Sequence, residues 1–374
     1  MKKCQTLGSI QDLYQELYND GYYHISEDIE KYPDAWLYII WSMRGPGKTY
    51  SFLRYMLIKD SIFIYMKRTN EDIDLLCQRG FKGDTSYDPS PFKPINRDFG
   101  TNIRPYKIRE GLAGFYEFNS EGEPEGPIKG YCLSLNSVSR YKGFDFSEAD
   151  YICFDEFIPM KGQVVKHAEG TLLLNFYMTV VRDRIKRGRG DLKLIMLANA
   201  DDIAVPSISE LEVMDTIATM NNTGVHILYD PDRKIFFHHI AAAEIDNDFE
   251  TMGIYQAMKD TAWGDIAFTG AFANNDFSNV SKNNLKGYKC LIHLIYRRKD
   301  IYLYLNPDTG RWHFTGSRNK YLLEYDLDRE NDQKRFYQEY GIDIRLACIE
   351  NRVTFDKYSY YDMFINYKKY FELR

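Results

Sequence analysis

One short segment of the chain has the residue types needed to bind a polyphosphate. It reads Ser42, Met43, Arg44, Gly45, Pro46, Gly47, Lys48 and Thr49. Glycines allow successive backbone N–H groups to converge on an anion. The lysine can reach the β- and γ-phosphates, and the threonine hydroxyl can bind Mg²⁺. We therefore predict a nucleotide-binding loop in which every residue of the segment lines the site and Lys48 also serves catalysis.

The residues on either side of this loop suit that interpretation. An apolar run at residues 36–41 predicts a buried strand, and residues 50–57 predict a helix. A helix N-terminus adds partial positive charge beside the phosphates. Ser42 stands where the usual pattern has glycine, and a serine fits there if the backbone is not restricted to glycine dihedral angles. The alternative is a tight strand-to-helix turn with a solvated lysine.

A pair of carboxylates follows a second apolar run. Residues 151–154 lead directly to Asp155 and Glu156. Open α/β sheets bind their ligands at the carboxyl ends of such strands. Asp155 is predicted to hold Mg²⁺ with Thr49, and Glu156 to polarise an attacking water. A strand that ends in a solvated acidic turn is the alternative.

A third apolar run, residues 192–198, ends at Asn199. In a P-loop motor such a residue would lie beside the γ-phosphate and respond to its loss. An ordinary strand cap explains Asn199 equally well.

A basic segment precedes this third strand. Residues 172–181 predict a helix that presents Arg182 at its end, and the cations that follow are Arg184, Lys186, Arg187 and Arg189. Such a segment can supply an arginine finger to a neighbouring subunit, or its cations can bind DNA phosphates. A solvated basic loop is the alternative.

Together these motifs resemble the DNA-packaging ATPase of small tailed phages of the phi-twenty-nine type. The likeness rests on residues 43–50, 63–68, 154–158 and 197–200, in that order. The resemblance implies a P-loop ATPase of the ASCE class, related to terminases. It also implies a homomeric ring, commonly a pentamer, that docks on a procapsid portal and drives double-stranded DNA into the head using ATP.

The resemblance assigns roles to single residues. Asp155 matches the magnesium aspartate, Glu156 the catalytic glutamate and Arg182 the finger that acts in trans. Lys142 matches a lysine implicated in nucleotide exchange, although a loop cation is an equally good interpretation. The expected cofactors are ATP and Mg²⁺. The expected partners are double-stranded DNA, further copies of the chain, the portal and a scaffold RNA, at a procapsid in the host cytoplasm.

Composition agrees with a globular enzyme. The chain has 374 residues, of which 44% are hydrophobic and 27% charged, enough for two domains with cores. Its longest apolar runs fall short of the ~20 residues that a membrane span needs, so no membrane partner is expected. The amino terminus lacks the apolar core of a signal peptide. The net charge of −6 argues against a generally DNA-adhesive surface but allows a basic ring lining.

The apolar pattern predicts an α/β protein with three parts. Residues 1–245 form a P-loop ATPase domain with a mostly parallel sheet, and residues 246–286 form a helical linker. Residues 287–374 form a small α+β domain, which the resemblance implies is RNase-H-like. Hairpins are expected within residues 102–118 and 225–240. The first of these is expected to belong to an insertion that faces DNA or a neighbouring subunit.

The last part is predicted not to be a nuclease. Two-metal cleavage needs clustered carboxylates, including one within the first strand, and this strand offers His293 instead. Asp300 follows three cations, Arg297, Arg298 and Lys299, which are candidate DNA-binding residues. The domain is expected to bind DNA, the portal or a scaffold RNA.

Two other classes of function remain open. A different P-loop motor, such as a replication helicase, would separate strands without a portal. A nucleotide-gated assembly protein would bind ATP and turn it over negligibly.

Overall fold

The computed structural model describes residues 21–79, 87–141, 143–160, 162–182, 184–245, 249–270, 272 and 275–371. The chain divides into two compact units. The first comprises residues 1–211 and 223–274, and the second comprises residues 212–222 and 275–374. Lys142 and the start of the chain lie outside the described residues. No helix in the described ranges has both the length and the apolar character needed to cross a bilayer.

The first unit is built on a nine-stranded sheet of order β3-β4-β5-β2-β6-β7-β1-β9-β8. Its strands are β1 (Leu37–Ser42), β2 (Phe63–Lys67), β3 (Ile103–Arg109), β4 (Leu112–Phe118), β5 (Pro124–Ser134), β6 (Tyr151–Asp155), β7 (Lys193–Asn199), β8 (Ile227–Asp230) and β9 (Ile235–Ile240). The central strands from β5 to β9 pair in parallel, and an antiparallel hairpin lies at each edge. The expected mostly parallel sheet is confirmed.

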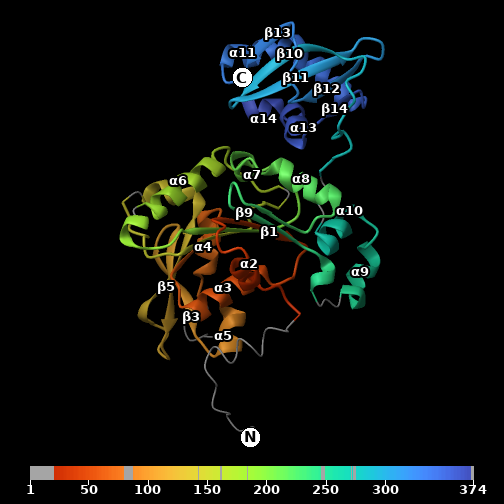
Figure 1. Ribbon diagram of the computed structural model, residues 1–374. Coiled ribbons are helices and arrows are strands. Elements are labelled where there is room, and N and C mark those ends of the chain that lie inside the picture. The colour runs from red at the N-terminus through yellow and green to blue at the C-terminus, as the bar shows by residue number, and fades with distance from the viewer. Residues whose placement is uncertain are drawn as a thin grey trace. The chain divides into compact units, whose positions relative to one another are not determined.

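The central strands are apolar because both faces of the sheet are covered. Every residue of β1 is buried, as expected for a parallel strand between helical layers. Figure 1 shows α2 and α3 on one side of β1 and α7 on the other. The helices of this unit are α2 (Ile25–Lys31), α3 (Lys48–Lys59), α4 (Asn70–Leu76), α5 (Lys93–Phe99), α6 (Glu169–Val181) and α7 (Pro206–Glu210), with short helical turns η1 (Leu135–Tyr141) and η2 (Ile185–Arg187).

The predicted hairpins are present, but the first is not part of an insertion outside the sheet. It forms β3 and β4, and β5 continues from it to pair in parallel with β2. Gly130 allows this pairing, because a Cβ there would lie 2.6 Å from the Phe63 ring. The segment therefore extends the nine-stranded sheet rather than standing apart from it.

Short helices follow β9 and make up the rest of the first unit. They are η3 (Ala242–Glu244), η4 (Phe249–Thr251), α9 (Gly253–Met258), α10 (Ala262–Gly264) and η5 (Asp265–Thr269). The last of them ends at Gly270, where a Cβ would lie 2.4 Å from the Met43 backbone nitrogen. This end of the helical segment is therefore packed against the first residues of the predicted phosphate loop.

The second unit contains a five-stranded sheet of order β13-β10-β11-β12-β14. Its strands are β10 (Lys289–Tyr296), β11 (Lys299–Asn306), β12 (Arg311–Thr315), β13 (Leu323–Asp326) and β14 (Val353–Phe355), and its helices are α8 (Met214–Thr223), α11 (Glu330–Phe336), η6 (Tyr337–Gly341), α12 (Ile342–Ile349), α13 (Tyr358–Ile365) and α14 (Tyr367–Phe371). Strands β10 to β12 form an antiparallel meander. The roles assigned to residues 1–245, 246–286 and 287–374 stay a prediction.

Candidate nucleotide-binding site

The predicted loop connects the carboxyl end of β1 to the amino end of α3. Gly45 and Gly47 have φ angles of +94° and +85°, which a side chain would strain. Ser42 is the last residue of β1 and is fully buried. Its hydroxyl donates to the Met43 carbonyl and accepts from Lys48 Nζ, at 2.6 and 2.5 Å. Serine therefore fits the position where the usual pattern has glycine.

Lys48 is folded against the loop that carries it. Its Nζ also contacts the Met43 carbonyl and Asn199 Oδ1, at 3.2 and 3.1 Å. The pKa of Lys48 is lowered to about 7, chiefly by burial and also by Arg44, although Asp155 and Glu156 oppose the shift. The contact with Asn199 brings the end of β7 to the loop, where the sequence had left Asn199 open between a neighbour of the γ-phosphate and an ordinary strand cap.

Asp155 lies at the end of β6 and faces the loop threonine. Thr49 Oγ1 is 3.1 and 3.2 Å from the two Asp155 carboxylate oxygens. Asp155 Oδ2 also accepts from the Tyr65 hydroxyl at 2.5 Å and lies 3.1 Å from Lys67 Nζ. A hydroxyl and a carboxylate side by side are the hard oxygen ligands that Mg²⁺ prefers.

Glu156 follows Asp155 in a strained backbone conformation. Its φ angle is +58°, which is uncommon for a residue other than glycine. The side chain is 56% exposed, and its carboxylate lies 3.0 Å from Lys67 Nζ. Lys67 therefore bridges the two acidic residues, and both carboxylates raise the pKa of its ammonium group although burial lowers it.

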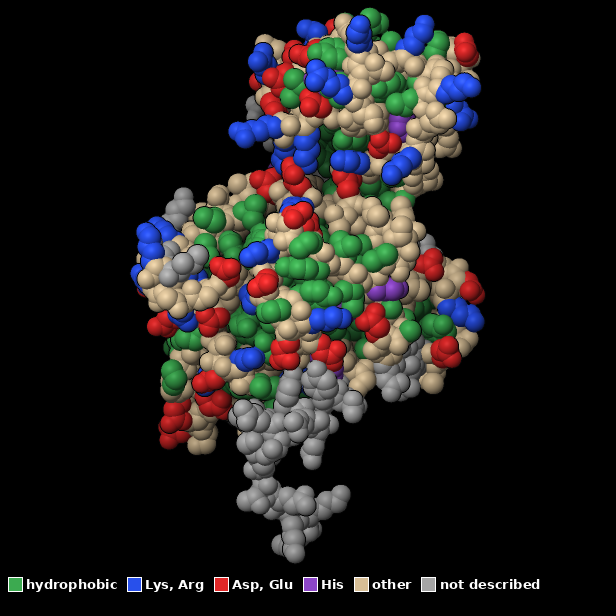
Figure 2. Space-filling view, in the orientation of Figure 1, with side chains coloured by type: hydrophobic (Ala, Val, Ile, Leu, Met, Phe, Trp, Pro, Cys, Tyr) green, Lys and Arg blue, Asp and Glu red, His purple; other side chains and the backbone are tan. Residues whose placement is uncertain are grey.

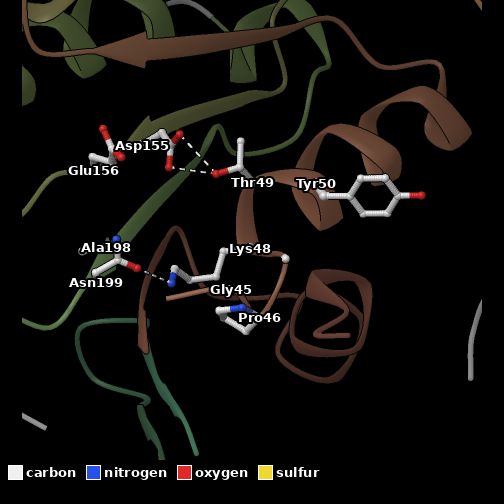
Figure 3. Close-up of a pocket in the computed structure, with 10 residues that line it drawn as sticks. Gly45, Pro46, Lys48, Thr49, Tyr50, Asp155, Glu156, Ala198 and Asn199 are labelled. Carbon is white, nitrogen blue, oxygen red and sulfur yellow. Dashed lines mark hydrogen bonds between the residues drawn. The ribbon is translucent and has the colours of Figure 1, made fainter. Parts of the chain in front are cut away.

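These groups line one open cavity. Its walls are Gly45, Pro46, Gly47, Lys48, Thr49, Tyr50, Asp155, Glu156, Ala198 and Asn199. Figure 3 shows Asp155 and Glu156 on one side of Thr49, and Asn199 directed toward Lys48. The predicted loop, the two carboxylates and the asparagine are thus brought together from three elements that are distant in the sequence.

Residues at the end of β2 support this arrangement, although the sequence pattern assigned them no role. Arg68 forms a buried ion pair with Glu169, with 2.7 Å between Nε and Oε2. It also donates to the Phe157 and Glu156 carbonyls, at 2.7 and 3.2 Å. Arg68 therefore ties the backbone after Asp155 to the start of α6. The only sequence signal for Tyr65, Lys67 and Arg68 was their place within residues 63–68, one of the segments that carry the resemblance.

The basic segment after α6 is only partly as predicted. Arg182 is exposed and directly follows the helix, as expected. Arg184 is 1% exposed. Its guanidinium donates to the Ser147, Ala149 and Gly190 carbonyls and to Asp150 Oδ1. The prediction that Arg184 binds DNA is therefore wrong, because its donors hold the segment to the residues before β6.

The other candidate DNA-binding cations are more accessible. Lys186 and Arg187 are exposed, whereas Arg189 is half-buried and donates to the Ser147 and Glu148 carbonyls. In the second unit, Arg297, Arg298 and Lys299 are exposed at the turn between β10 and β11, and Lys299 lies 2.9 Å from Glu212.

No protein-family model and no curated protein matches the chain. Two solved structures resemble it over nearly its whole length. The bacteriophage Phi-29 viral genome packaging motor assembly contains a chain that is 15% identical, with a TM-score of 0.61, and the match covers 93% of this chain and 99% of that chain. The Phi-28 gp11 DNA packaging motor is 16% identical, with a TM-score of 0.58, and the match covers 94% of this chain and 98% of that chain. The chain therefore has the fold of these phage packaging-motor proteins, which is the fold that its sequence resemblance predicts.

Proposed function

We propose that the protein is an ATPase that drives double-stranded DNA into a viral procapsid as one subunit of a homomeric ring. The observation that carries this proposal is the cavity in which Lys48, Thr49, Asp155, Glu156 and Asn199 converge. Its residue types match the needs of nucleotide hydrolysis, and it occurs in a chain with the fold of packaging-motor proteins.

Each group in the cavity has a separate role. The backbone N–H groups of Gly45, Gly47, Lys48 and Thr49, together with the Lys48 ammonium, would hold the phosphates, whereas Pro46 has no N–H to donate. Thr49 and Asp155 would hold Mg²⁺, because their oxygens already face one another across 3.1 Å. When bound, Mg²⁺ would neutralise charge on the phosphate oxygens.

Glu156 is proposed to accept the proton of the attacking water. Its side chain is exposed, and the residue lines the cavity just beyond the end of β6. The Lys67 ammonium lies 3.0 Å from the Glu156 carboxylate and balances its charge. Asn199 would sense the γ-phosphate, because Asn199 contacts Lys48, the lysine that would bind this phosphate.

The course of α6 supports a finger that acts in trans. The helix begins at Glu169, which Arg68 holds near the carboxyl ends of β2 and β6. It ends before Arg184, which is anchored to the residues that precede β6. A helix of 13 residues is about 20 Å long, and its far end is anchored beside the amino end of β6, whereas the cavity lies at the carboxyl ends of the strands. Arg182 would therefore act on the nucleotide of a neighbouring subunit.

The second unit is proposed to bind DNA, the portal or a scaffold RNA rather than to cut DNA. The His293 imidazole nitrogens lie 2.7 Å from Asp300 and 3.0 Å from Glu324, so both carboxylates are engaged by the imidazole. Basic and acidic side chains are interspersed on the face of this unit seen in Figure 2. The proposed place of action is a procapsid in the host cytoplasm.

Mg²⁺-dependent ATP hydrolysis tests this function directly. Wild type and Glu156→Gln would be assayed with and without double-stranded DNA, over a range of protein concentrations. We expect turnover that DNA stimulates, that rises with concentration, and that falls by about 10²–10⁴-fold in the variant. Strand separation without any portal would favour a helicase instead. Tight ATP binding without turnover would favour a nucleotide-gated assembly protein.

The Lys48 pKa predicts how ATP affinity depends on pH. The folded-state pKa of about 7 leaves this lysine largely neutral at alkaline pH. Phosphate charge stabilises the protonated form, so binding takes up a proton there. Affinity should rise by up to about tenfold as pH falls from about 9 to about 8, a range in which the phosphates stay ionised.

Calorimetry in two buffers with different ionisation heats would measure the proton uptake. Lys48→Arg is the matched control, because its guanidinium stays charged and should abolish the pH dependence of binding. A wild-type affinity that does not change over this range would contradict the proposed titration of Lys48.

A further inference from the structure

The polarity of the cavity indicates where the nucleoside part of a bound nucleotide must lie. Glu156 and Asn199 mark the end that would face the γ-phosphate, and Thr49 lies in the middle. Figure 3 shows the Tyr50 ring on the side of Thr49 that is opposite Asp155 and Glu156. The base and sugar would therefore leave the loop on the Tyr50 side.

A second tyrosine lies against the loop itself. A Cβ at Gly47 would lie 3.2 Å from Cδ1 of Tyr22, so the ring packs directly on this glycine. The next residue pins the chain there, because the Tyr23 N–H donates to the Pro46 carbonyl at 3.0 Å. The Tyr22 side chain is nevertheless 52% exposed, which leaves part of the ring accessible.

The Tyr50 ring is held in place by charged neighbours. Its hydroxyl donates to Asp98 Oδ2 at 2.8 Å, and the Arg54 guanidinium lies 5.4 Å from the ring centre. Arg97 pairs with the other Asp98 oxygen and is 76% exposed.

We propose that Tyr22 and Tyr50 form the subsite for the nucleotide base, with Tyr22 as the stacking surface and Tyr50 as the wall beside the α-phosphate. This inference rests on the proposed nucleotide loop. An aromatic ring fixed at the loop gains stacking energy with any base, and a nearby guanidinium adds a planar cation that also stacks.

The test compares ATP with inorganic tripolyphosphate, which carries the phosphates without a base. Dissociation constants of both would be measured for the full-length protein by calorimetry with Mg²⁺. Tyr22→Ala is expected to weaken ATP binding by about tenfold and to leave tripolyphosphate binding nearly unchanged. Tyr22→Trp should restore ATP binding. Tyr106→Ala removes a comparably exposed tyrosine on β3 and should change neither constant.

The possible outcomes separate the two proposals. If Tyr22→Ala weakens both ligands equally, Tyr22 supports the loop and does not contact the base, and the inference is wrong. If wild type binds ATP no more tightly than tripolyphosphate, the chain has no base subsite. If wild type binds neither ligand, the proposed nucleotide loop fails and the inference fails with it.

Discussion

Replacing Arg182 with alanine should lower ATP hydrolysis by about 10³-fold or more while leaving ATP binding nearly intact. The side chain is exposed at the end of α6, with no contact to its own cavity among the described residues. Charge that develops on the transferred phosphoryl group would gain this guanidinium as a further partner only when a neighbouring copy presents it. The loss should therefore appear in kcat and not in the affinity for ATP.

Mixing two inactive variants gives the decisive measurement. Arg182→Ala retains its own Glu156, and Glu156→Gln retains its own Arg182. In a mixed ring, a site is complete where the cavity of an Arg182→Ala subunit meets the arginine of a Glu156→Gln subunit. Random mixing of equal amounts produces this arrangement at roughly a quarter of interfaces. Hydrolysis should therefore return on mixing, although each variant alone is inactive at the same total concentration.

The control is the double variant that carries both substitutions. Mixed with Arg182→Ala, it supplies no intact finger and should give no recovery. Recovery with the double variant, or full activity of Arg182→Ala alone, would refute an arginine supplied in trans. Full activity of dilute wild type without any concentration dependence would argue against it as well.

The sequence was most informative where the chemistry is local. Residues 42–49 are contiguous, so their glycines, lysine and threonine reveal the loop without knowledge of the rest of the fold. Asp155 and Asn199 were also predictable, because polar residues at the carboxyl ends of parallel strands meet at one edge of a sheet. The contact of Asn199 with Lys48 follows from that rule.

The supporting residues depended on strand order, which the sequence does not reveal. Lys67 reaches Asp155 and Glu156 only because β2 lies next to β6. Arg184 resembles Arg187 in its local sequence, yet only Arg184 is buried. Two of the carbonyls that accept its hydrogen bonds belong to Ser147 and Ala149, more than thirty positions earlier. Long-range partners of this kind leave no periodic signal in the chain.

Replacing Arg68 with alanine is expected to destabilise the first unit by about 3–5 kcal/mol. The Arg68 and Glu169 side chains are 6% and 1% exposed. Burial raises the pKa of the Glu169 carboxyl group, and the bonds to Arg68 oppose that shift. Without Arg68 the carboxylate has lost its charge partner in a site that water hardly reaches. The Phe157 carbonyl also loses its donor.

Urea unfolding monitored by tryptophan fluorescence would measure this loss, since Trp36, Trp41 and Trp263 belong to the first unit and only Trp312 to the second. Arg140→Ala is the matched control, because Arg140 and Glu110 are 61% and 63% exposed and such pairs contribute at most about 1 kcal/mol.

Arg68→Met with Glu169→Leu should recover most of the stability, because it removes the buried charge along with its partner. The same double variant should stay deficient in ATP hydrolysis, since the Glu156 and Phe157 carbonyls would no longer be held by Arg68. If Arg68→Ala unfolds at the same urea concentration as wild type, the ion pair does not secure the segment that follows Asp155, and the position of Glu156 must depend on its strained backbone and on Lys67 alone.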